Sequence, residues 1–446
     1  MRETTAATEA VMSTTARDPP TRPTRVRIRM LGLIFVTVVI NYMDRSNLAL
    51  LAPIVSKDLA LSSVQMGALF SAFGWAYVAG QLPGGWLVDR AAPRLLYPLL
   101  MGGWSIVTCA QGLAQGFAGL FGLRLGMGLL EAPSFPINAK VVTAWFPERE
   151  RARAIGFYTS GQFVGLAFVT PILAYVQAAL GWRAVFFATG LAGILFSVIW
   201  WIFYRDPREC PAANQAELDH IRQGGGLAGA ARVSAGSVWN WAQMRIVLGT
   251  RSLWGVFLGH TCVTTTLWFF LTWFPTYLVE YRHMQFIKMG LWAAVPFIAA
   301  FVGVLLSGIF SDLLIRFGAS LSTARKTPVI CGLVLSMSIV GANYVERESF
   351  AMAFLTLAFF GNGLASIGWT FVSALAPANM IGTTGGIYNF IGNSSAIFVP
   401  IVIGVLVRGG SFEPALIFVG ACALVGVLAY GFLVQDVQRI AVATAK

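Results

Sequence analysis

The feature that most constrains this chain of 446 residues is a series of long apolar segments. Each is about 20 residues long, the length of helix that crosses ~30 Å of hydrocarbon. With 57% hydrophobic and only 11% charged residues, the chain could not bury its apolar surface as a soluble globule. We therefore predict an all-α integral membrane protein with about twelve transmembrane helices. The apolar segments begin near Met30, Val64, Leu95, Ala118, Ala152, Arg183, Leu253, Met289, Thr327, Phe350, Thr383 and Pro414.

The two halves of the chain share short motifs in the same order, which predicts two pseudo-symmetric six-helix bundles. In membrane proteins built from such repeats, a ligand site lies near the midplane between the halves, and access to it alternates by rocking. The matching motifs are Gly85-Trp-Leu-Val-Asp89 with Gly308-Ile-Phe-Ser-Asp312, Gly126-x-Gly128 with Gly361-x-Gly363, and Gly156-Phe-Tyr158 with Gly386-Ile-Tyr388.

Polar segments divide the chain into five predicted parts. Most of the 31 basic residues fall in segments expected to face the cytoplasm, as the positive-inside rule requires. Both termini are therefore expected to be cytoplasmic, and the net charge of +12 needs no nucleic-acid partner. The parts are a disordered cytoplasmic tail (1–27), an N-terminal bundle (28–205), a cytoplasmic linker (206–250), a C-terminal bundle (251–437) and a cytoplasmic tail (438–446).

Two acids and two bases lie inside apolar segments of the first half: Asp44, Arg45, Arg124 and Glu131. A charge at the centre of a membrane helix costs roughly 2.5 to 3.5 kcal/mol on insertion scales. Such residues persist when they pair, line a wet cavity or handle a charged cargo. Their presence predicts that the protein moves an ionic solute.

Arg45 has the planar guanidinium that best matches a carboxylate, and it is the predicted anchor for an anion. Its alternative role is a structural ion pair between helices. Asp44 is its neighbour, about 100° away around a helix, so the two side chains can serve different faces.

Arg124 and Glu131 are seven residues apart, which places them on one helix face, about 10 Å apart. Glu131 is the predicted carrier of a proton, with Arg124 as a supporting charge. The alternative is a static pair between the two residues, because structural networks also perturb ionisation.

The second half has no acid at mid-span and offers neutral polar residues instead. These could bind hydroxyl groups, or they could make interhelical hydrogen bonds. His260 is expected to pack as a buried neutral group rather than to titrate. The neutral polar residues are Asn362, Ser366, Asn389 and Asn393, with Trp369 near them.

Asp89, Arg90 and Arg94 lie at the predicted cytoplasmic end of a span, and we expect them to act as a gate latch. The sequence has no GxxxxGK[ST] motif and no cluster typical of nucleophilic catalysis or metal binding. We therefore predict no enzyme activity, cofactor or metal site.

The segment GGWLVDRAAPR (84–94) resembles the signature loop of the major facilitator superfamily. The narrower resemblance is to its anion:cation symporter branch, and there to bacterial sugar-acid/proton symporters of the galactonate type. The segments that carry it are NYMDRSN (41–47), EAPSFP (131–136), WFPERERA (145–152), GFYTSGQFVGLAF (156–168), TLWFFLTWFPTYL (266–278), ARKTPVICG (324–332) and FFGNGLASIGW (359–369).

The resemblance implies import of a sugar acid anion, such as an aldonate, by proton symport across the bacterial cytoplasmic membrane. It assigns proton coupling to Asp44 and Glu131, and one chain suffices to enclose the path. Gly368 departs from the galactonate pattern, where Thr is usual, and agrees with the glucarate pattern. The substrate contacts that the resemblance implies are Tyr42, Arg45, Tyr77, Gln162, Ser366, Trp369 and Asn389.

Other functions remain open at this stage. A glucarate, galactarate or hexuronate symporter of the same family is the main alternative. An exporter of organic cations is disfavoured, because Arg45 and Arg124 would repel its cargo. A non-transporting sensor or passive channel would have little use for titratable acids within a repeated, alternating-access architecture.

Overall fold

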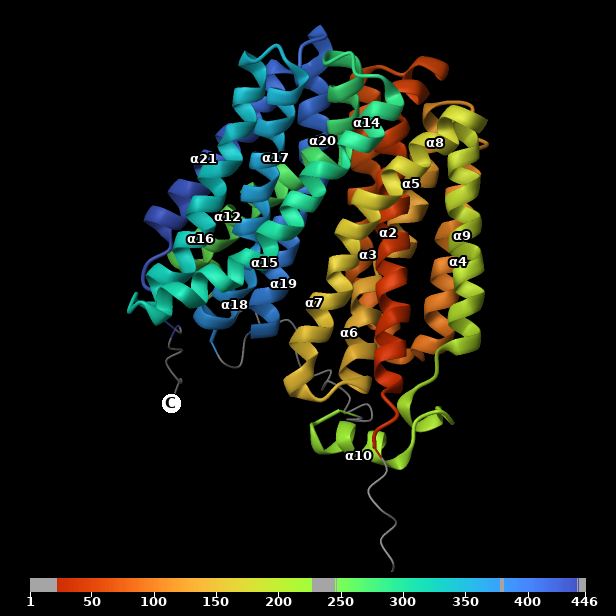
Figure 1. Ribbon diagram of the computed structural model, residues 1–446, viewed down its shortest axis with the longest axis vertical. Helices are drawn as coiled ribbons and strands as arrows, with labels where there is room; N and C mark the ends of the chain where they lie inside the picture. The colour runs from red at the N-terminus through yellow and green to blue at the C-terminus, as the bar shows by residue number, and fades with distance from the viewer. Residues whose placement is uncertain (1–21, 227–244, 246, 378–380, 439, 441–446) are drawn as a thin grey trace, which may run out of the picture.

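The computed structural model describes residues 22–226, 245, 247–377, 381–438 and 440, and all regular structure in these ranges is helical. Figure 1 shows two groups of long helices side by side. The predicted tails lie largely outside the described residues, as does much of the predicted linker.

The first group contains the helices up to residue 203, and its helix ends follow local sequence signals. Ser62 and Gln65 form a reciprocal capping box that starts α3. Gly181, at φ +84°, makes the turn between α8 and α9. The helices are α2 (Val26–Asp58), α3 (Ser63–Arg90), α4 (Pro93–Gln111), α5 (Phe117–Glu131), α6 (Ser134–Trp145), α7 (Glu148–Val164), the π-helical η1 (Gly165–Val169), α8 (Thr170–Leu180) and α9 (Trp182–Phe203).

The segment after α9 lies at one end of the first bundle (Figure 1). It contains the 3₁₀ turn η2 (Pro207–Glu209) and α10 (Gln215–Gln223). Glu217 of α10 is fully buried and accepts hydrogen bonds from the backbone N–H groups of Val26 and Arg27. It thereby caps the N-terminus of α2 and fixes α10 to this bundle.

The second group repeats the arrangement with more interruptions. Several of its helices end in 3₁₀ or π turns, which split single passages into two labelled pieces. Its elements are α12 (Arg251–Thr272), α13 (Phe274–Thr276), η3 (Tyr277–Tyr281), α14 (Phe286–Trp292), α15 (Ala294–Arg316), α16 (Leu321–Ser336), η4 (Met337–Tyr344), α17 (Glu348–Leu364), η5 (Ala365–Ile367), α18 (Gly368–Leu375), α19 (Ile381–Asn393), α20 (Ser395–Leu406), η6 (Val407–Gly409), α21 (Glu413–Leu428) and η7 (Ala429–Leu433).

Among the described residues, 9 helices are long and apolar enough to cross a membrane. The helices at the other predicted segments, near Val64, Leu95 and Ala118, are interrupted or less apolar. The chain is thus a multi-pass helical protein, as predicted, and the figure of twelve crossings stays a prediction.

The two bundles meet at the end opposite α10 and diverge toward α10 (Figure 1). At the meeting end α3 lies against α20, where Gly67 faces the backbone of Pro400 and Gly74 faces Ala396. The Ser71 hydroxyl donates to the carbonyl of Ile397 at 2.6 Å. Because these glycines have no side chain, the two backbones approach closely and seal that end.

Candidate functional site

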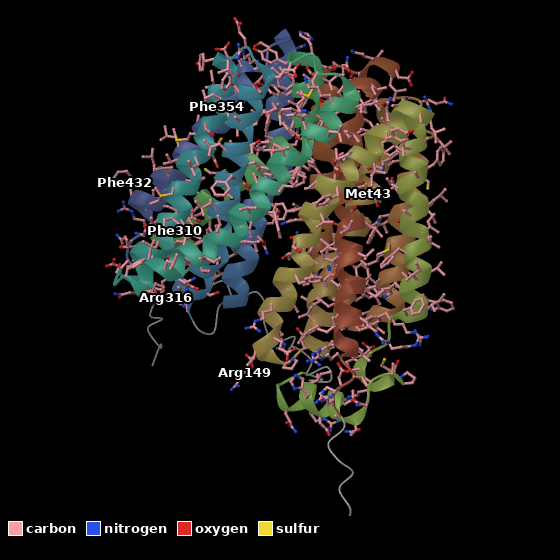
Figure 2. All side chains as sticks on the ribbon, in the orientation of Figure 1. Met43, Arg149, Phe310, Arg316, Phe354 and Phe432 are labelled. Atoms are coloured by element: carbon pink, nitrogen blue, oxygen red, sulfur yellow. The ribbon has the colours of Figure 1, made fainter. Side chains whose placement is uncertain are left out.

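A buried ion pair joins two helices of the first bundle near its mid-height. The Arg45 Nε of α2 donates to the Glu131 Oε2 of α5 at 2.8 Å. Glu131 is fully buried and Arg45 is 9% exposed. Figure 2 labels Met43, two residues before Arg45, about halfway along α2.

The position of Glu131 follows from the local sequence. Glu131 is the last residue of α5, and Pro133 precedes the first residue of α6. Proline cannot donate a backbone hydrogen bond, so the passage breaks there. A carboxylate at a helix C-terminus is disfavoured by the helix dipole, and the guanidinium of Arg45 offsets that cost.

Three aromatic rings surround the Arg45 guanidinium. Its central carbon lies 5.0 Å from the ring centroid of Tyr42, 4.9 Å from that of Phe73 and 4.8 Å from that of Tyr77. Phe73 and Tyr77 are one helical turn apart on α3 and stack at 5.4 Å. Such rings attract and orient a cation. Arg45 Nη2 is buried in this setting without a hydrogen-bond partner.

Arg124 is buried but makes no ion pair among the described residues. Its Nη1 lies 3.6 Å from the sulfur of Met127, and its Nε has no hydrogen-bond partner. It interacts electrostatically with Asp44 and with Glu131. The pairing of Glu131 with Arg124, the alternative raised by the sequence, is therefore absent from this conformation, and Arg45 takes that place.

Asp44 lies on a different side of α2 from the ion pair, as expected for adjacent helical residues. It is 1% exposed, and neither carboxylate oxygen has a hydrogen-bond partner. The side chains of Trp104 and Thr189 lie beside it. Asn47, one turn further along α2, donates to the Thr189 hydroxyl at 2.7 Å.

The other predicted contact residues come from both bundles. Tyr77 and Gln162 of the first bundle are half-buried. Ser366 lies in the turn η5 and is exposed, and Asn389 of α19 is half-buried. Asn362 donates to the Val263 carbonyl at 2.6 Å, which fits an interhelical role. The side chain of Trp369 lies outside the described residues.

The predicted latch residues lie at the end where the bundles diverge. Arg90 is exposed and packs on the Trp86 ring at 4.1 Å. Arg94 is half-buried and interacts electrostatically with Asp206 of the linker. Asp89 is exposed, and within the described ranges none of the three latch residues makes an ion pair.

The sequence did not indicate Phe73 as part of the site, nor which residue His260 packs against. Phe73 forms part of the cage around Arg45, and only its spacing of four from Tyr77 hinted at a shared face. His260 stacks on Tyr388 with ring centroids 3.9 Å apart, so its packing role involves a specific aromatic partner.

The comparison with family models gives one match, to the Major Facilitator Superfamily, over residues 34–400. The chain belongs to the major facilitator superfamily. Members of this superfamily are membrane transporters, so the protein is a transporter and not an enzyme.

Relatives and solved structures agree with this membership. The D-galactonate transporter of Escherichia coli O6:H1 is 50% identical over 94% of this chain and 98% of its own length. A probable galactarate/D-glucarate transporter of Bacillus subtilis is 41% identical over 95% of each chain. The xylose transporter XylE of E. coli, in an inward open conformation, superposes with a TM-score of 0.70 at 13% identity, over 92% of this chain and 96% of that one. At that identity the likeness shows the fold alone.

Proposed function

We propose that this transporter imports a sugar acid anion together with protons by alternating access, with D-galactonate as the first candidate substrate. The proposal places it in a bacterial cytoplasmic membrane with both termini in the cytoplasm, acting as a monomer. The relative that is named a D-galactonate transporter supports the choice of substrate class.

The proposal rests mainly on the different environments of two guanidinium nitrogens of Arg45. Its Nε is bonded to Glu131, whereas its Nη2 is buried, held by aromatic rings and unpaired. A carboxylate is the group whose geometry and charge best satisfy that donor. The hydroxyl groups of the sugar acid would then reach Gln162, Ser366 and Asn389, while Tyr42, Tyr77 and Trp369 pack on its carbon chain.

Asp44 and Glu131 are the proposed proton carriers. A buried ionised carboxylate without a hydrogen bond is costly, so Asp44 fits this conformation best in its neutral, protonated form. Glu131 instead holds Arg45 as an ion pair. Protonation of Glu131 would break that pair and release the guanidinium to the anion. Arg124, close to both acids, would stabilise whichever is ionised.

A dicarboxylic sugar acid is the second candidate, and Gly368 favours it. A Cβ atom added at Gly368 would lie 2.0 Å from the Tyr388 hydroxyl, so a larger residue there requires Tyr388 to move. The relative named as a probable galactarate/D-glucarate transporter supports this candidate as well. Hexuronates are a third choice, and a cation exporter stays disfavoured by the two buried arginines.

Uptake into proteoliposomes under an imposed pH gradient tests the proposal. The substrates are radiolabelled galactonate, gluconate, glucarate and galacturonate, and the control is the same vesicles without a gradient. We expect gradient-dependent accumulation of at least one anion and competition by its nearest analogues. Equal uptake with and without the gradient would reject proton symport, and no uptake of any of the four would reject the substrate class.

A further inference from the structure

Around Asn41, one helical turn before Arg45 on α2, lies a group of buried polar side chains that make no hydrogen bond of ordinary geometry. Asn41, Ser134 and Asn138 are each at most 1% exposed. Both polar atoms of Asn41, both of Asn138 and the Ser134 hydroxyl lack a hydrogen-bond partner. The second carboxyl oxygen of Glu131, Oε1, also lacks a hydrogen-bond partner.

These groups form a continuous set. The Asn41 amide interacts with the Glu131 carboxyl group and the Asn138 amide with the Tyr97 hydroxyl, but neither contact has the geometry of a full hydrogen bond. Tyr97 of α4 donates to the hydroxyl of Thr37 at 3.0 Å. The set therefore runs through the interior of the first bundle, between α2, α4 and α6.

Helix periodicity explains how the set is assembled. Thr37, Asn41 and Arg45 follow at intervals of four on α2 and share one face. Ser134 and Asn138 are likewise four apart on α6, directly after the break at Pro133. The same face of α2 thus presents the guanidinium and, toward α10, the unpaired amide.

Unpaired polar groups at this depth are expensive. A buried polar group without a hydrogen bond loses the bonds that it makes to water in the unfolded chain, and more than ~90% of buried polar groups in proteins are paired. The five unpaired side-chain atoms of Asn41, Ser134 and Asn138, together with Glu131 Oε1, form a suitable lining for internal water. A buried water molecule typically makes about three hydrogen bonds.

We propose that Asn41, Ser134 and Asn138 enclose a buried water site that exchanges the proton of Glu131 at Oε1, the carboxyl oxygen that does not accept from Arg45. The inference rests on the proposed function, because it assumes that Glu131 is a coupling acid. It adds a separate route: the anion binds Arg45, whereas the proton reaches the Oε1 atom of Glu131 through the interior of the first bundle.

The transfer conserves charge and atoms at each step. The acid form of Glu131 gives its proton to a bound water as that water releases one of its own to the Ser134 or Tyr97 hydroxyl. Each hydroxyl in turn releases its own proton to the next oxygen, with Thr37 following Tyr97 toward the α10 end of the bundle, so no charge stays on the relay. Glu131 is left as a carboxylate, which then re-forms its bond to Arg45. The titratable and charged groups that face Glu131 are Tyr42, Asp44 and Arg45 on α2, Tyr97 on α4 and Arg124 on α5.

The variant Asn138→Leu tests the inference, because leucine keeps the approximate volume but cannot bind water. Two assays are compared in proteoliposomes: uptake driven by a pH gradient, and exchange of labelled for unlabelled substrate at equal pH. We expect gradient-driven uptake to fall at least tenfold, as for loss of a proton-transfer group, while exchange stays within about twofold. Asn138→Ser, which restores a hydroxyl and room for water, should recover gradient-driven uptake.

Asn343→Leu is the matched control, since Asn343 lies in η4 of the other bundle and bonds the Glu413 carbonyl. It should leave both assays unchanged. If Asn138→Leu matches the wild type in gradient-driven uptake, or if it lowers both assays equally, the buried water site is refuted as a proton route. Failure of the wild-type protein to accumulate substrate would instead refute the proposed function.

A structure at a resolution that reveals ordered water is the second, independent test. We expect a water within hydrogen-bond distance of Glu131 Oε1 and of Asn41 or Asn138. Direct bonds between these side chains, with no water among them, would overturn the inference whether or not any variant folds.

Discussion

The Arg45 side chain makes two kinds of interaction, an ion pair and contacts with aromatic rings. Together they fix the position of its guanidinium. One edge of the guanidinium holds Glu131, its faces lie against aromatic rings, and Nη2 remains unpaired. A lysine at this position would supply a positive charge but only a point contact, without a planar, multi-donor edge.

The variant Arg45→Lys is therefore expected to bind galactonate at least tenfold more weakly than the wild type. The physical reason is the loss of a charge-assisted hydrogen bond, worth ~1.5–3 kcal/mol when buried. Equilibrium binding of labelled substrate to purified protein provides the measurement. Unchanged affinity would remove Arg45 as the anion anchor.

Glu131→Gln should separate binding from coupling. Glutamine keeps the size of the side chain and can accept a hydrogen bond from Arg45, but it cannot release a proton. We expect substrate binding and equal-pH exchange to persist, while accumulation driven by a pH gradient stops. Normal accumulation by this variant would contradict the role of Glu131 in coupling.

For individual residues, the sequence indicated which side chains belong to the candidate site but not which side chains they contact. A charge inside an apolar segment is visible without a structure, so Asp44, Arg45, Arg124 and Glu131 stood out. Spacing along one helix related Glu131 to Arg124, but the bond to Arg45 depends on how α2 packs against α5. Asn41 and Asn138 carry no charge, so composition alone could not single them out.

Single helices show the same contrast between local signals and tertiary contacts. The apolar segments predicted where helices lie, because their length and hydropathy are properties of the sequence itself. The π turn η1 and the 3₁₀ turn η5 depend on packing and had no clear sequence signal. Pro133 was visible in the sequence, but its effect, the placing of Glu131 at a helix end, required the structure.

The docking of α10 onto the start of α2 is expected to depend on pH. Burial raises the pKa of Glu217, but hydrogen bonds from Thr24 and from the backbone of Val26 and Arg27 outweigh it and hold the pKa below its usual range. A depressed pKa means that the ionised form stabilises docking above the undocked pKa of ~4.3. This stabilisation is lost as the pH falls through the lower, docked value.

Hydrogen exchange of the α10 backbone measures this effect. Exchange in the wild type should be slow at pH 7 and accelerate, after correction for intrinsic rates, as the pH falls below about 4. Glu217→Gln should exchange faster at pH 7 and lose the pH dependence. Asp219→Asn is the control and should behave as the wild type, because Asp219 is half-buried and its partners, Gln215 and Arg222, lie in α10 itself.

In the described part of the chain the two bundles approach each other most closely toward one end, and glycines bring α3 and α20 together there. A Cβ atom at Gly74 would lie 2.7 Å from the Ala396 carbonyl oxygen, whereas one at Gly122 would meet nothing within 4 Å. Gly74→Ala should therefore destabilise the contact between α3 and α20 by roughly 1–3 kcal/mol, a typical cost of overpacking.

Labelling of a reporter cysteine measures this shift. Thr276 lines a cavity of about 280 Å³ at the sealed end, between the two bundles. In a background without the 5 native cysteines, Thr276→Cys should react at least tenfold faster with a membrane-impermeant reagent when Gly74→Ala is present. Gly122→Ala should not change the rate, and equal rates for both variants would argue against a glycine-dependent seal.

The existence of two bundles could be predicted from the repeated motifs, since duplicated sequence implies duplicated structure. Which end is sealed could not, because the pattern of apolar segments does not determine how the two bundles are tilted against each other. The latch residues illustrate this: Asp89 was expected to pair, and at the diverging end of this conformation it has no ion-pair partner among the described residues.

The free edge of Arg45 has a consequence for the order of events during transport. Under the proposed function, a substrate carboxylate bonds to Nη2, which is buried in this conformation, once the surrounding side chains move aside, while Nε still holds Glu131. Without substrate the guanidinium holds Glu131 in its ionised form, which opposes a return of the empty transporter with a bound proton. In the proposed cycle, proton leak is thus limited by one arginine side chain that contacts both the acid and the substrate.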